Sequence, residues 1–580
     1  MLTPTATEIT DAWLSKFADL VRTGSTDNLS VVFGEDAWWR DILAFSWDFT
    51  TRHAAGPIAD LLSVAPDKAP GGFTVSDLAA PAFTDDEQSA ILAFFDFEIE
   101  YGRGTGTVQL TKADDGTWRA WAVLTTLQEL KGHEEKNGHH RPHGGPAGGG
   151  TAQPNWLDRR RSQSDFTDTE PDVLVVGAGH TGLTIAARLG QLDVATLVVD
   201  RNPRVGDNWR ARYRSLVLHD PVWYDHLPYL PFPSTWPVFT PKDKMGDWLE
   251  IYAGALDLNV WTSSSITSVE HDAASGAWTV TVSRGNGEEQ VLHPKHVIMA
   301  TGISGNEPYE PELTGRDDFS GEVLHSSRYR SGQAYAGKRV LVVGAGNSGH
   351  DVAQDLCENG AEVTMLQRSA TFVISTDTVM AVLMGLYQEG GIPTDVADLI
   401  AASTPALASI PGLQAATKIA MDRDAALLDG LRKAGFGVSS GVDGTGSMFL
   451  FYTKNGGYYI DVGCSELIVG GRIKVKHGVE IGKMSADTVT FSDGDVQQFD
   501  AVILATGYRG ILETARRLLG DDVTERCGPV WGLDDEGEIR SVWRESGQKG
   551  LWFTGGNLGM SRPNSKFLAL QVKADLLGLR

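Results

Sequence analysis

The chain has 580 residues, and its 41% hydrophobic and 22% charged residues are an ordinary balance for a globular protein with a sizeable core. The formal net charge of −25 disfavours a nucleic-acid partner, because phosphate binding needs a basic surface. The three cysteines form no Cys-x-x-Cys pair, which disfavours both a disulfide framework and a zinc site. The sequence shows no secretory signal and no apolar run near the ~18 residues of a transmembrane helix. We therefore expect a cytoplasmic protein of about three to four domains that contacts no membrane.

The region 1–131 predicts a small α+β unit. Residues 11–21 carry apolar side chains at helical spacing, and residues 94–101, 106–110 and 118–126 are aromatic or β-branched stretches typical of strands. Gly116 marks a hairpin turn between the last two. Helices followed by a meander of strands are typical of an α+β domain.

The stretch 33–41 reads Phe-Gly-Glu-Asp-Ala-Trp-Trp-Arg-Asp and resembles the nuclear-transport-factor-like cone fold, in which a curved sheet wraps around helices. Some cones of this type are enzymes with an Asp–His or Asp–Arg pair in the pocket, which makes Arg40 and Asp41 candidates. We favour a structural ion pair that holds the first helices to the sheet. A third hypothesis is a non-catalytic docking or dimerisation module, the latter joining two chains into a homodimer.

The segment 132–165 is polar and rich in Gly, His and Arg. We expect a linker or a surface wrap, because such a composition cannot bury enough apolar surface to offset its chain entropy. Its histidines are also metal-ligand candidates, since His-rich tracts sometimes bind metals. We favour solvated linker histidines, so the sequence predicts no metal site. These histidines are His133, His139, His140 and His143.

A first glycine fingerprint follows the linker. An apolar strand at 173–176 runs into Gly177, Gly179 and Gly182. The first glycine allows a tight turn, the second lets the backbone approach a pyrophosphate, and the third lets the next helix pack close to the strand. The second strand of this unit ends at Asp200, where a carboxylate accepts hydrogen bonds from ribose hydroxyls and repels a 2′-phosphate. This site therefore predicts FAD.

A second fingerprint follows the strand at 340–343, and its glycine-rich turn comprises Gly344, Gly346, Asn347, Ser348 and Gly349. Its next strand, at 362–366, leads to Arg368 where the first site has Asp200. An arginine there suits a 2′-phosphate, so this site predicts NADPH. The alternative is that Arg368 is a surface cation and that NADH serves equally well.

A set of four residues at fixed spacing lies between the two glycine fingerprints. Two apolar strands, one before and one after the second fingerprint, end in Ala-Thr-Gly at 300–302 and 505–507. The four residues of the string are Phe319, Gly321, His325 and Tyr329. With these motifs, the chain from about residue 170 to its end resembles the flavin-containing monooxygenases, the family that also holds Baeyer–Villiger monooxygenases. Baeyer–Villiger enzymes of the main class usually carry Trp at the last position of the string, so Tyr329 favours the flavin-containing monooxygenase side.

The resemblance implies the fold class: an α/β two-dinucleotide-binding flavoprotein of double Rossmann type, preceded by the small α+β cone domain. It implies an FAD-binding domain in two parts, 166–330 and 500–580, around an NADP-binding domain at 331–499. The mostly helical stretch 376–435 is too long for an ordinary crossover. We expect it to be an insertion that covers the cleft and lines the substrate's entrance.

A second family string follows the first fingerprint and includes Asn208, Trp209 and His219. Mammalian-type enzymes have an Asn beside the flavin where His219 stands. The resembling sequences with His there are the plant indole-3-pyruvate monooxygenases and the type II enzymes. Type II enzymes also carry an extra N-terminal domain, tolerate NADH and perform Baeyer–Villiger oxidation. The resemblance therefore favours the type II branch, in a bacterial or fungal lineage.

The C-terminal region supplies the last flavin contact. A strand at 551–553 enters a glycine turn, and Asn557 stands where many related flavoproteins use Asp to hold the ribityl chain. We expect the next helix to begin near Pro563 and to stabilise negative charge on the reduced flavin. The resemblance implies further FAD contacts at Arg201, Ile266 and Gln571.

The resemblance also implies the chemistry. NADPH gives hydride to FAD, and molecular oxygen then forms a C4a-(hydro)peroxyflavin that inserts one oxygen atom into a small organic substrate. The substrate is a ketone, by Baeyer–Villiger oxidation, or a soft sulfur or nitrogen nucleophile. The alternatives are oxidative decarboxylation of the indole-3-pyruvate type and an uncoupled NADPH oxidase.

Two histidines have expected roles. His325 orients the domain linker that couples NADPH to the flavin, and His219, with an ordinary pKa of ~6.5, sets the proton balance of the oxygenating species. A pyridine-nucleotide disulfide reductase is the rival class, but it needs a redox-active cysteine pair that the sequence does not have.

Overall fold

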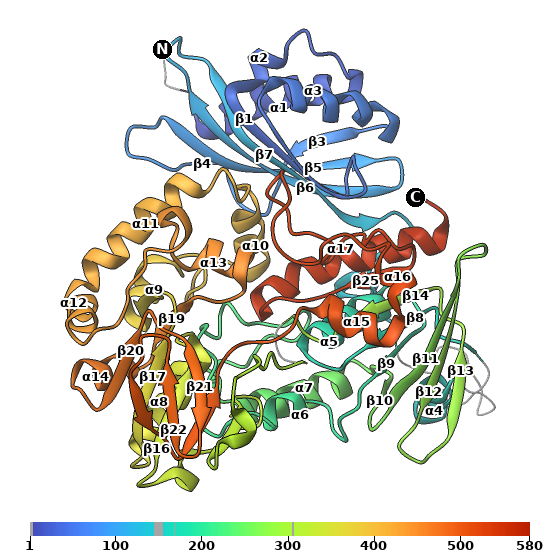
Figure 1. Ribbon diagram of the computed structural model, residues 1–580. Helices are drawn as coiled ribbons and strands as arrows, with labels where there is room; N and C mark the ends of the chain where they lie inside the picture. The colour runs from blue at the N-terminus through green and yellow to red at the C-terminus, as the bar shows by residue number, and fades with distance from the viewer. Residues whose placement is uncertain (1–3, 144–154, 167–168, 304–306) are drawn as a thin grey trace.

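The computed structural model describes residues 4–143, 155–166, 169–303 and 307–580. The N-terminal α+β unit lies across the top of the view in Figure 1, above the C-terminal helix α17 and the inserted helices. Two further bodies, each built around a parallel sheet, lie below it (Figure 1). No helix in the described ranges is long and apolar enough to cross a membrane.

The N-terminal unit is one mixed sheet with helices on one face. Its strand order is β2-β1-β7-β6-β5-β3, and β4 pairs with β5. The strands are β1 (Phe33–Ile42), β2 (Phe49–His53), β3 (Gly71–Val75), β4 (Ala82–Phe83), β5 (Ala90–Ile99), β6 (Gly102–Lys112) and β7 (Trp118–Leu130). The helices are α1 (Ala6–Thr23), α2 (Leu29–Val32) and α3 (Ala55–Val64). The predicted helix at 11–21 and the predicted turn at Gly116, whose φ is +80°, are both present.

Aromatic side chains fill the space between α1 and the sheet. The ring of Phe17 lies 5.6 Å from that of Trp39 and 5.8 Å from that of Phe95. All three side chains are fully buried. The interior of the N-terminal unit is therefore a packed core at this point, because interdigitated rings leave no room for a ligand.

The predicted pairing of Arg40 with Asp41 is wrong. Successive residues of a strand point to opposite faces, so the two side chains separate. Asp41 points into the unit, is fully buried, and accepts hydrogen bonds from the hydroxyls of Thr125 and Ser46, each at 2.7 Å. Arg40 points out of the unit and forms an ion pair with Glu538 at 2.7 Å. The ion pair thus joins the sheet to the C-terminal part of the chain instead of to its own helices.

The next body is a parallel sheet of order β10-β9-β8-β14-β25. Its strands are β8 (Val173–Val176), β9 (Thr196–Val199), β10 (Val260–Trp261), β14 (His296–Met299) and β25 (Leu551–Phe553). An antiparallel sheet is attached to it and contains β11 (Ser265–Asp272), β12 (Ala277–Ser283) and β13 (Glu289–Leu292). The helices of this body are α5 (His180–Gln191), α6 (Asp207–Arg210), α7 (Lys242–Ala255), α15 (Ile511–Leu519), α16 (Asp521–Thr524) and α17 (Leu558–Leu577).

The third body repeats the arrangement with the parallel order β15-β24-β16-β17-β20. Its strands are β15 (Glu322–His325), β16 (Arg339–Val343), β17 (Glu362–Gln367), β20 (Ile473–His477) and β24 (Ala501–Leu504). Small sheets at its sides contain β18 (Phe372–Ser375), β19 (Tyr458–Asp461), β21 (Ile481–Ser485), β22 (Thr488–Phe491) and β23 (Val496–Gln498). Its sheet-covering helices are α8 (Asn347–Glu358) and α14 (Cys464–Val469).

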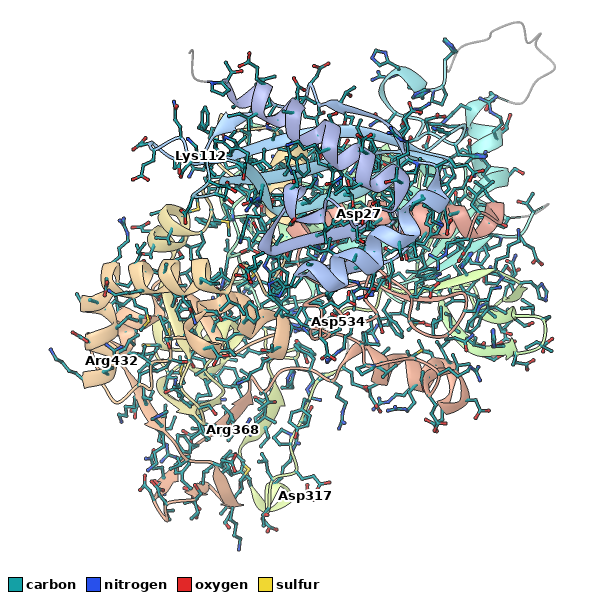
Figure 2. All side chains as sticks on the ribbon, turned by 90° about the horizontal axis from the view of Figure 1, so that it is seen from above. Asp27, Lys112, Asp317, Arg368, Arg432 and Asp534 are labelled. Atoms are coloured by element: carbon teal, nitrogen blue, oxygen red, sulfur yellow. The ribbon has the colours of Figure 1, made fainter. Side chains whose placement is uncertain are left out.

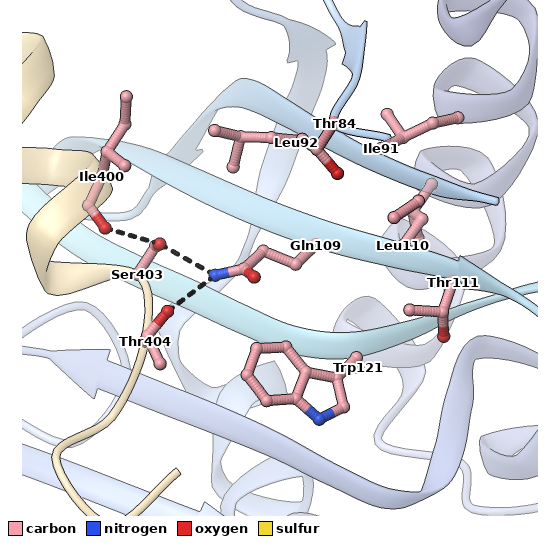
Figure 3. Close-up of a pocket in the computed structure, with 11 residues that line it drawn as sticks. Thr84, Ile91, Leu92, Gln109, Leu110, Thr111, Trp121, Ile400, Ser403 and Thr404 are labelled. Atoms are coloured by element: carbon pink, nitrogen blue, oxygen red, sulfur yellow. Dashed lines mark hydrogen bonds between the residues drawn. The ribbon is translucent and has the colours of Figure 1, made fainter. Parts of the chain in front are cut away.

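The region 376–435 is helical as predicted and contains α9 (Thr376–Val382), α10 (Thr394–Ala402), α11 (Ile410–Arg423) and α12 (Ala425–Lys433), followed by α13 (Gly446–Lys454). Its α10 end meets the outer face of the N-terminal sheet. There Gln109 of β6 donates hydrogen bonds to Ser403 at 3.0 Å and Thr404 at 2.9 Å, beside a small cavity (Figure 3).

The segment after β7 wraps over the second body. Glu135 forms an ion pair with Arg188 of α5 at 3.2 Å, and the backbone N–H of Lys136 donates to the Gln191 carbonyl at 2.9 Å. Helix α4 (Trp156–Asp165) follows. The four linker histidines are exposed, and the described ranges contain no group of three metal-ligating side chains.

Candidate functional site

A cleft of about 1110 Å³ is lined by residues of both parallel sheets. The turns that follow β8 and β16, with the strand ends at Val199 and Ala300, contribute to its wall. Ligands of open α/β sheets bind outside the carboxyl ends of the strands, and these turns lie there. The volume exceeds the ~300–1,000 Å³ of a pocket for one drug-sized molecule. The cleft therefore has room for more than one small ligand.

The first glycine turn is closed by the backbone around it. Gly177 has a φ of +110°, and a Cβ there would lie 2.6 Å from the Ala300 carbonyl oxygen. A Cβ on Gly182 would lie 1.9 Å from the Gly177 carbonyl oxygen. Only glycine fits either position, because these neighbours are backbone atoms. Gly179 caps α5 and leaves the helix N-terminus facing the cleft, as a pyrophosphate requires.

Asp200 ties the end of β9 to this turn. Its Oδ2 accepts a hydrogen bond from the Ala178 N–H at 2.6 Å, and its Oδ1 accepts one from the Asn202 N–H at 2.7 Å. Each carboxylate oxygen has a second lone pair, and Asp200 lines the cleft. The geometry suits a ribose whose hydroxyls donate to this carboxylate.

The second glycine turn has the same construction. Gly344 has a φ of +117°, and a Cβ there would lie 2.4 Å from the Ala505 carbonyl oxygen. A Cβ on Gly349 would lie 2.1 Å from the Gly344 carbonyl oxygen, whereas one on Gly346 would meet nothing closer than 3.9 Å. Gly346 thus stands open to the cleft, where a bound phosphate can approach the backbone.

Arg368 directly follows β17 in the third body, which holds the second glycine turn. Figure 2 labels it in the body opposite the N-terminal unit, which Asp27 and Lys112 mark. Its side chain is 76% exposed, and its Nη1 lies 3.4 Å from Glu480. A contact this exposed and this long is weak. The guanidinium is therefore available for a phosphate bound in the cleft, which Arg368 also lines.

Buried polar atoms in the cleft wall have no hydrogen-bond partner among the described residues. They include Trp209 Nε1, Arg212 Nε, His219 Nδ1 and Thr301 Oγ1. Buried donors and acceptors are normally satisfied, so this set indicates a polar ligand. The ring, hydroxyl and phosphate groups of FAD fit such a wall.

The C-terminal turn also reaches the cleft through Gly555, Gly556 and Asn557. The Asn557 side chain accepts a hydrogen bond from the Met560 N–H at 3.0 Å and so caps α17, which begins at Leu558. The prediction that this helix begins near Pro563 is wrong, because the Asn cap starts the helix earlier and Pro563 lies inside it. The helix N-terminus nevertheless faces the cleft as expected.

His219 bridges the two halves of the cleft. Its Nε2 lies 3.5 Å from the Asp351 carboxylate on α8, which also accepts a hydrogen bond from the Tyr213 hydroxyl at 2.6 Å. Burial alone would lower the pKa of His219, but the carboxylates of Asp351 and Asp220 outweigh it and raise that pKa above its ordinary 6.5. His219 can therefore hold a proton at the junction of the two fingerprints.

His325 lies behind the cleft wall. It is fully buried, and its Nε2 lies 2.9 Å from the Gly507 carbonyl oxygen, while its Nδ1 accepts a hydrogen bond from the Ser327 N–H at 3.1 Å. Since Nδ1 accepts, Nε2 carries the hydrogen and donates to Gly507. Burial lowers the pKa of His325, which favours this neutral form. The contact ties the segment after β15 to the Ala-Thr-Gly turn, which does line the cleft.

The cleft brings most of the predicted site residues together. Those that line it are Gly177, Gly179, Asp200, Arg201, Asn208, Trp209, His219, Ile266, Gly346, Asn347, Ser348, Gly349, Arg368 and Asn557. Gly182 and Gly344 close the two turns from behind. Gln571 does not line the cleft; it is fully buried, and its amide donates to the carbonyls of Trp543 at 3.0 Å and Phe567 at 3.2 Å.

Among the cleft residues that the sequence-based prediction missed are Tyr213, Asp220, Asp225 and Asp351. Asp351 stands two positions after the second fingerprint, which was its only local signal. The cleft has no lining residue from 376–435, so the lining of the substrate's entrance by the inserted helices stays a prediction. Those helices pack between the third body and the N-terminal sheet (Figure 1), and Asp398 of α10 binds Arg562 of α17.

The three cysteines are free thiols, and none lines the described cleft. A disulfide reductase needs a cysteine pair at this place. Two glycine-rich dinucleotide cradles that open into one cleft, without that pair, define an oxidoreductase of the two-dinucleotide flavoprotein class.

Comparison with known proteins defines the family more narrowly. A family profile described as "Pyridine nucleotide-disulphide oxidoreductase" matches residues 174–388. The chain is 32% identical over 429 residues to indole-3-pyruvate monooxygenase YUCCA1 of Oryza sativa subsp. japonica, covering 72% of this chain and 95% of that protein. It is 33% identical over 342 residues to the probable indole-3-pyruvate monooxygenase YUCCA7 of Arabidopsis thaliana, covering 58% and 74%.

Among solved structures, a flavin-containing monooxygenase from Stenotrophomonas maltophilia is similar at 19% identity and a TM-score of 0.48, covering 70% of this chain and 99% of that one. The identity and coverage of the rice relative show that the chain belongs to the flavin-containing monooxygenase family. It is an enzyme, and its cofactors are FAD and NADPH.

Proposed function

We propose that the protein is a monooxygenase that uses NADPH and FAD to insert one atom of molecular oxygen into a small organic substrate. The proposed substrate is either a ketone, by Baeyer–Villiger oxidation, as one class, or a soft sulfur or nitrogen nucleophile, as a second class. The observation that carries the proposal is the single cleft shared by both fingerprints, with His219 and Asp351 joining its halves.

The first half of the cleft is the proposed FAD site. Gly179 and the N-terminus of α5 receive the pyrophosphate, Asp200 receives the ribose, and Asn557 with the N-terminus of α17 receives the flavin's pyrimidine edge. FAD, when bound, supplies the chemistry that accepts hydride and activates oxygen. Gly346 and Arg368 belong to the proposed NADPH site, where the guanidinium binds the 2′-phosphate. NADH tolerance stays a prediction.

His219 is the proposed proton-holding residue. A group that holds a proton near the reacting oxygen favours attack on sulfur and nitrogen, and one that releases it favours attack on a carbonyl carbon. The raised pKa of His219 keeps its proton available above the ordinary 6.5. His325, which fixes the Ala-Thr-Gly turn through Gly507, is the proposed positioning residue between the domains.

A second candidate function is oxidative decarboxylation of a 2-oxo acid of the indole-3-pyruvate type. The similarity to the rice indole-3-pyruvate monooxygenase over 95% of that protein favours it. Both functions act on a carbonyl compound, so the product and not the coenzyme consumption separates them.

The N-terminal unit supports assignment to the type II branch. We propose the division 1–131 for a nuclear-transport-factor-like domain, 132–165 for the linker, 166–330 with 500–580 for FAD and 331–499 for NADPH. Buried polar contacts fix the first domain to the rest, since Arg40 pairs with Glu538 and Gln109 bonds to Ser403 and Thr404 (Figure 3). This domain is thus proposed as a structural part of the enzyme.

The test is a substrate panel with the full-length enzyme. NADPH and NADH consumption is measured with cyclic ketones, sulfides, amines and indole-3-pyruvate, and each product is identified by mass spectrometry. Lactone from a cyclic ketone supports the first class, sulfoxide or N-oxide supports the second, and indole-3-acetate supports the decarboxylase. Hydrogen peroxide as the sole product with every compound would contradict the proposal.

A further inference from the structure

Two aspartates on the segment after His219 lie in the cleft wall. Asp220 and Asp225 both contribute to the lining. The Asp220 carboxylate accepts a hydrogen bond from Asn557 Nδ2 at 3.3 Å, and the same amide lies 3.3 Å from the Tyr224 hydroxyl. Asn557 caps α17, so this carboxyl group stands beside the helix end that receives the flavin's pyrimidine edge in the proposed function.

Asp225 has the more unusual environment of the two aspartates. It is only 1% exposed, and neither of its carboxyl oxygens has a hydrogen-bond partner in the described part of the chain. Burial disfavours a carboxylate that lacks such partners, so the neutral acid is the stable form. Burial, and after it the charge of Asp220, raises the pKa of Asp225 well above its usual range. Burial also raises the pKa of Asp220, against the opposing effect of His219.

Arg562 acts in the opposite direction on the pKa of Asp225, but it does not outweigh burial and Asp220. Arg562 of α17 donates to the two oxygens of Asp398 at 2.7 Å each, and its Nη1 donates to the carbonyls of Tyr224 at 2.6 Å and His226 at 2.9 Å. Its charge is therefore balanced by Asp398, while it holds the backbone on both sides of Asp225. Among the described residues, the titratable and charged groups around the two aspartates and the segment between them are His219, Tyr224, His226, Tyr387, Glu389, Asp398, Tyr452, Tyr458 and Arg562.

We propose that Asp220 and Asp225 form a proton-holding pair that keeps the flavin end of the cleft from gaining a second negative charge when FAD is reduced. The proposal rests on the proposed function, which places FAD there. Hydride transfer moves two electrons and one proton from NADPH, which leaves NADP⁺ and one negative charge on the reduced cofactor. The pair keeps its proton, and no bond to either carboxyl group forms or breaks. Loss of that proton at high pH puts a carboxylate beside the new charge and makes reduction less favourable.

The test is the midpoint potential of bound FAD as a function of pH in the full-length holoenzyme. Asp225→Asn replaces the neutral acid by a neutral amide of the same shape. We expect the wild-type potential to fall more steeply on the alkaline side than that of D225N. At high pH the reduction equilibrium of D225N should be about tenfold more favourable, which is about 30 mV for a two-electron couple. Superimposable curves for the two proteins would overturn the proposal.

Asp41→Asn is the matched control. Asp41 is also a buried aspartate whose pKa burial raises, but it lies in the N-terminal sheet, so D41N should follow the wild-type curve. A second measurement needs no variant. The reduced-minus-oxidised infrared spectrum of the wild type reports carboxyl groups that sense the flavin, and we expect the carbonyl band of a protonated acid. A spectrum without that band would overturn the pair, whereas a chain that binds no FAD would overturn the proposed function itself.

Discussion

The ion pair between Arg40 and Glu538 gives the sharpest stability prediction. Arg40 Nε and Nη2 each donate at 2.7 Å to Glu538, whose side chain is 4% exposed. Arg40→Met leaves that carboxylate with the Thr51 hydroxyl at 2.7 Å as its one remaining side-chain donor in the described part of the chain. Removing one partner of a buried pair costs about 3–5 kcal/mol. We expect the low end, about 3 kcal/mol, because Glu538 keeps the Thr51 bond and can take up a proton.

The pair also has a predicted pH dependence. Burial alone would raise the pKa of Glu538, but Arg40 outweighs it and holds that pKa below the ordinary 4.5. The stabilisation from this carboxylate is therefore present above the unfolded value of 4.5, and it is lost as the pH falls through the lowered folded value. Arg40→Met should remove this acid-side loss along with the stability.

Urea unfolding of the full-length chain, followed by circular dichroism, measures both effects in the transition that melts the N-terminal sheet. Arg40→Met/Glu538→Leu removes both charges and should return to within about 1 kcal/mol of the wild type. Arg103→Met is the control on the same sheet. Its side chain is 44% exposed, so its ion pair with Glu129 should contribute less than about 1 kcal/mol. A single variant as stable as the wild type, or a double variant no better than the single one, would refute the reasoning.

The remaining predictions concern the cleft. Arg368→Ala removes the charge that meets the 2′-phosphate, so the KM for NADPH should rise about tenfold while that for NADH stays unchanged; equal losses for both coenzymes in steady-state kinetics would contradict the assignment. Asp200→Asn should weaken FAD binding about tenfold or more in a fluorescence titration, because it removes a charged acceptor from the ribose; unchanged affinity would place the ribose elsewhere. Asp351 and Asp220 outweigh burial and raise the pKa of His219 above 6.5, so His219 keeps its proton below that raised pKa and loses it as the pH rises through that value. The wild-type ratio of lactone to sulfoxide should therefore increase with pH across the same range. His219→Asn should give a pH-independent ratio, and unchanged ketone oxidation in that variant would count against the role of His219.

The glycine cradles were predictable from the sequence because they are local. A tight strand–turn–helix needs glycine at fixed spacings, and the strand predicted at 173–176 has those bounds in the structure. Gly177 and Gly344 take positive φ values that the spacing already required. The same local pattern predicts that Asp200 and Arg368 stand at the ends of β9 and β17.

Contacts between distant segments were not predictable in this way. Nothing in the periodicity near Arg40 points to Glu538, and nothing near His219 points to Asp351, because side-chain pairing across sheets depends on how the bodies pack. Proline is common in the first turn of a helix, so Pro563 predicts a later start for α17 than the Asn557 cap gives it. The roles of the cleft residues, a cytoplasmic location and a homodimer stay predictions.

The most direct test of the central claim is isotope transfer from molecular oxygen. The full-length enzyme is incubated with NADPH, ¹⁸O₂ and a cyclic ketone, and the product is analysed by mass spectrometry beside the NADPH consumed. We predict one ¹⁸O atom in each molecule of lactone and one NADPH consumed for each product formed. Unlabelled product, or NADPH consumption matched by hydrogen peroxide alone for every substrate, would contradict the account.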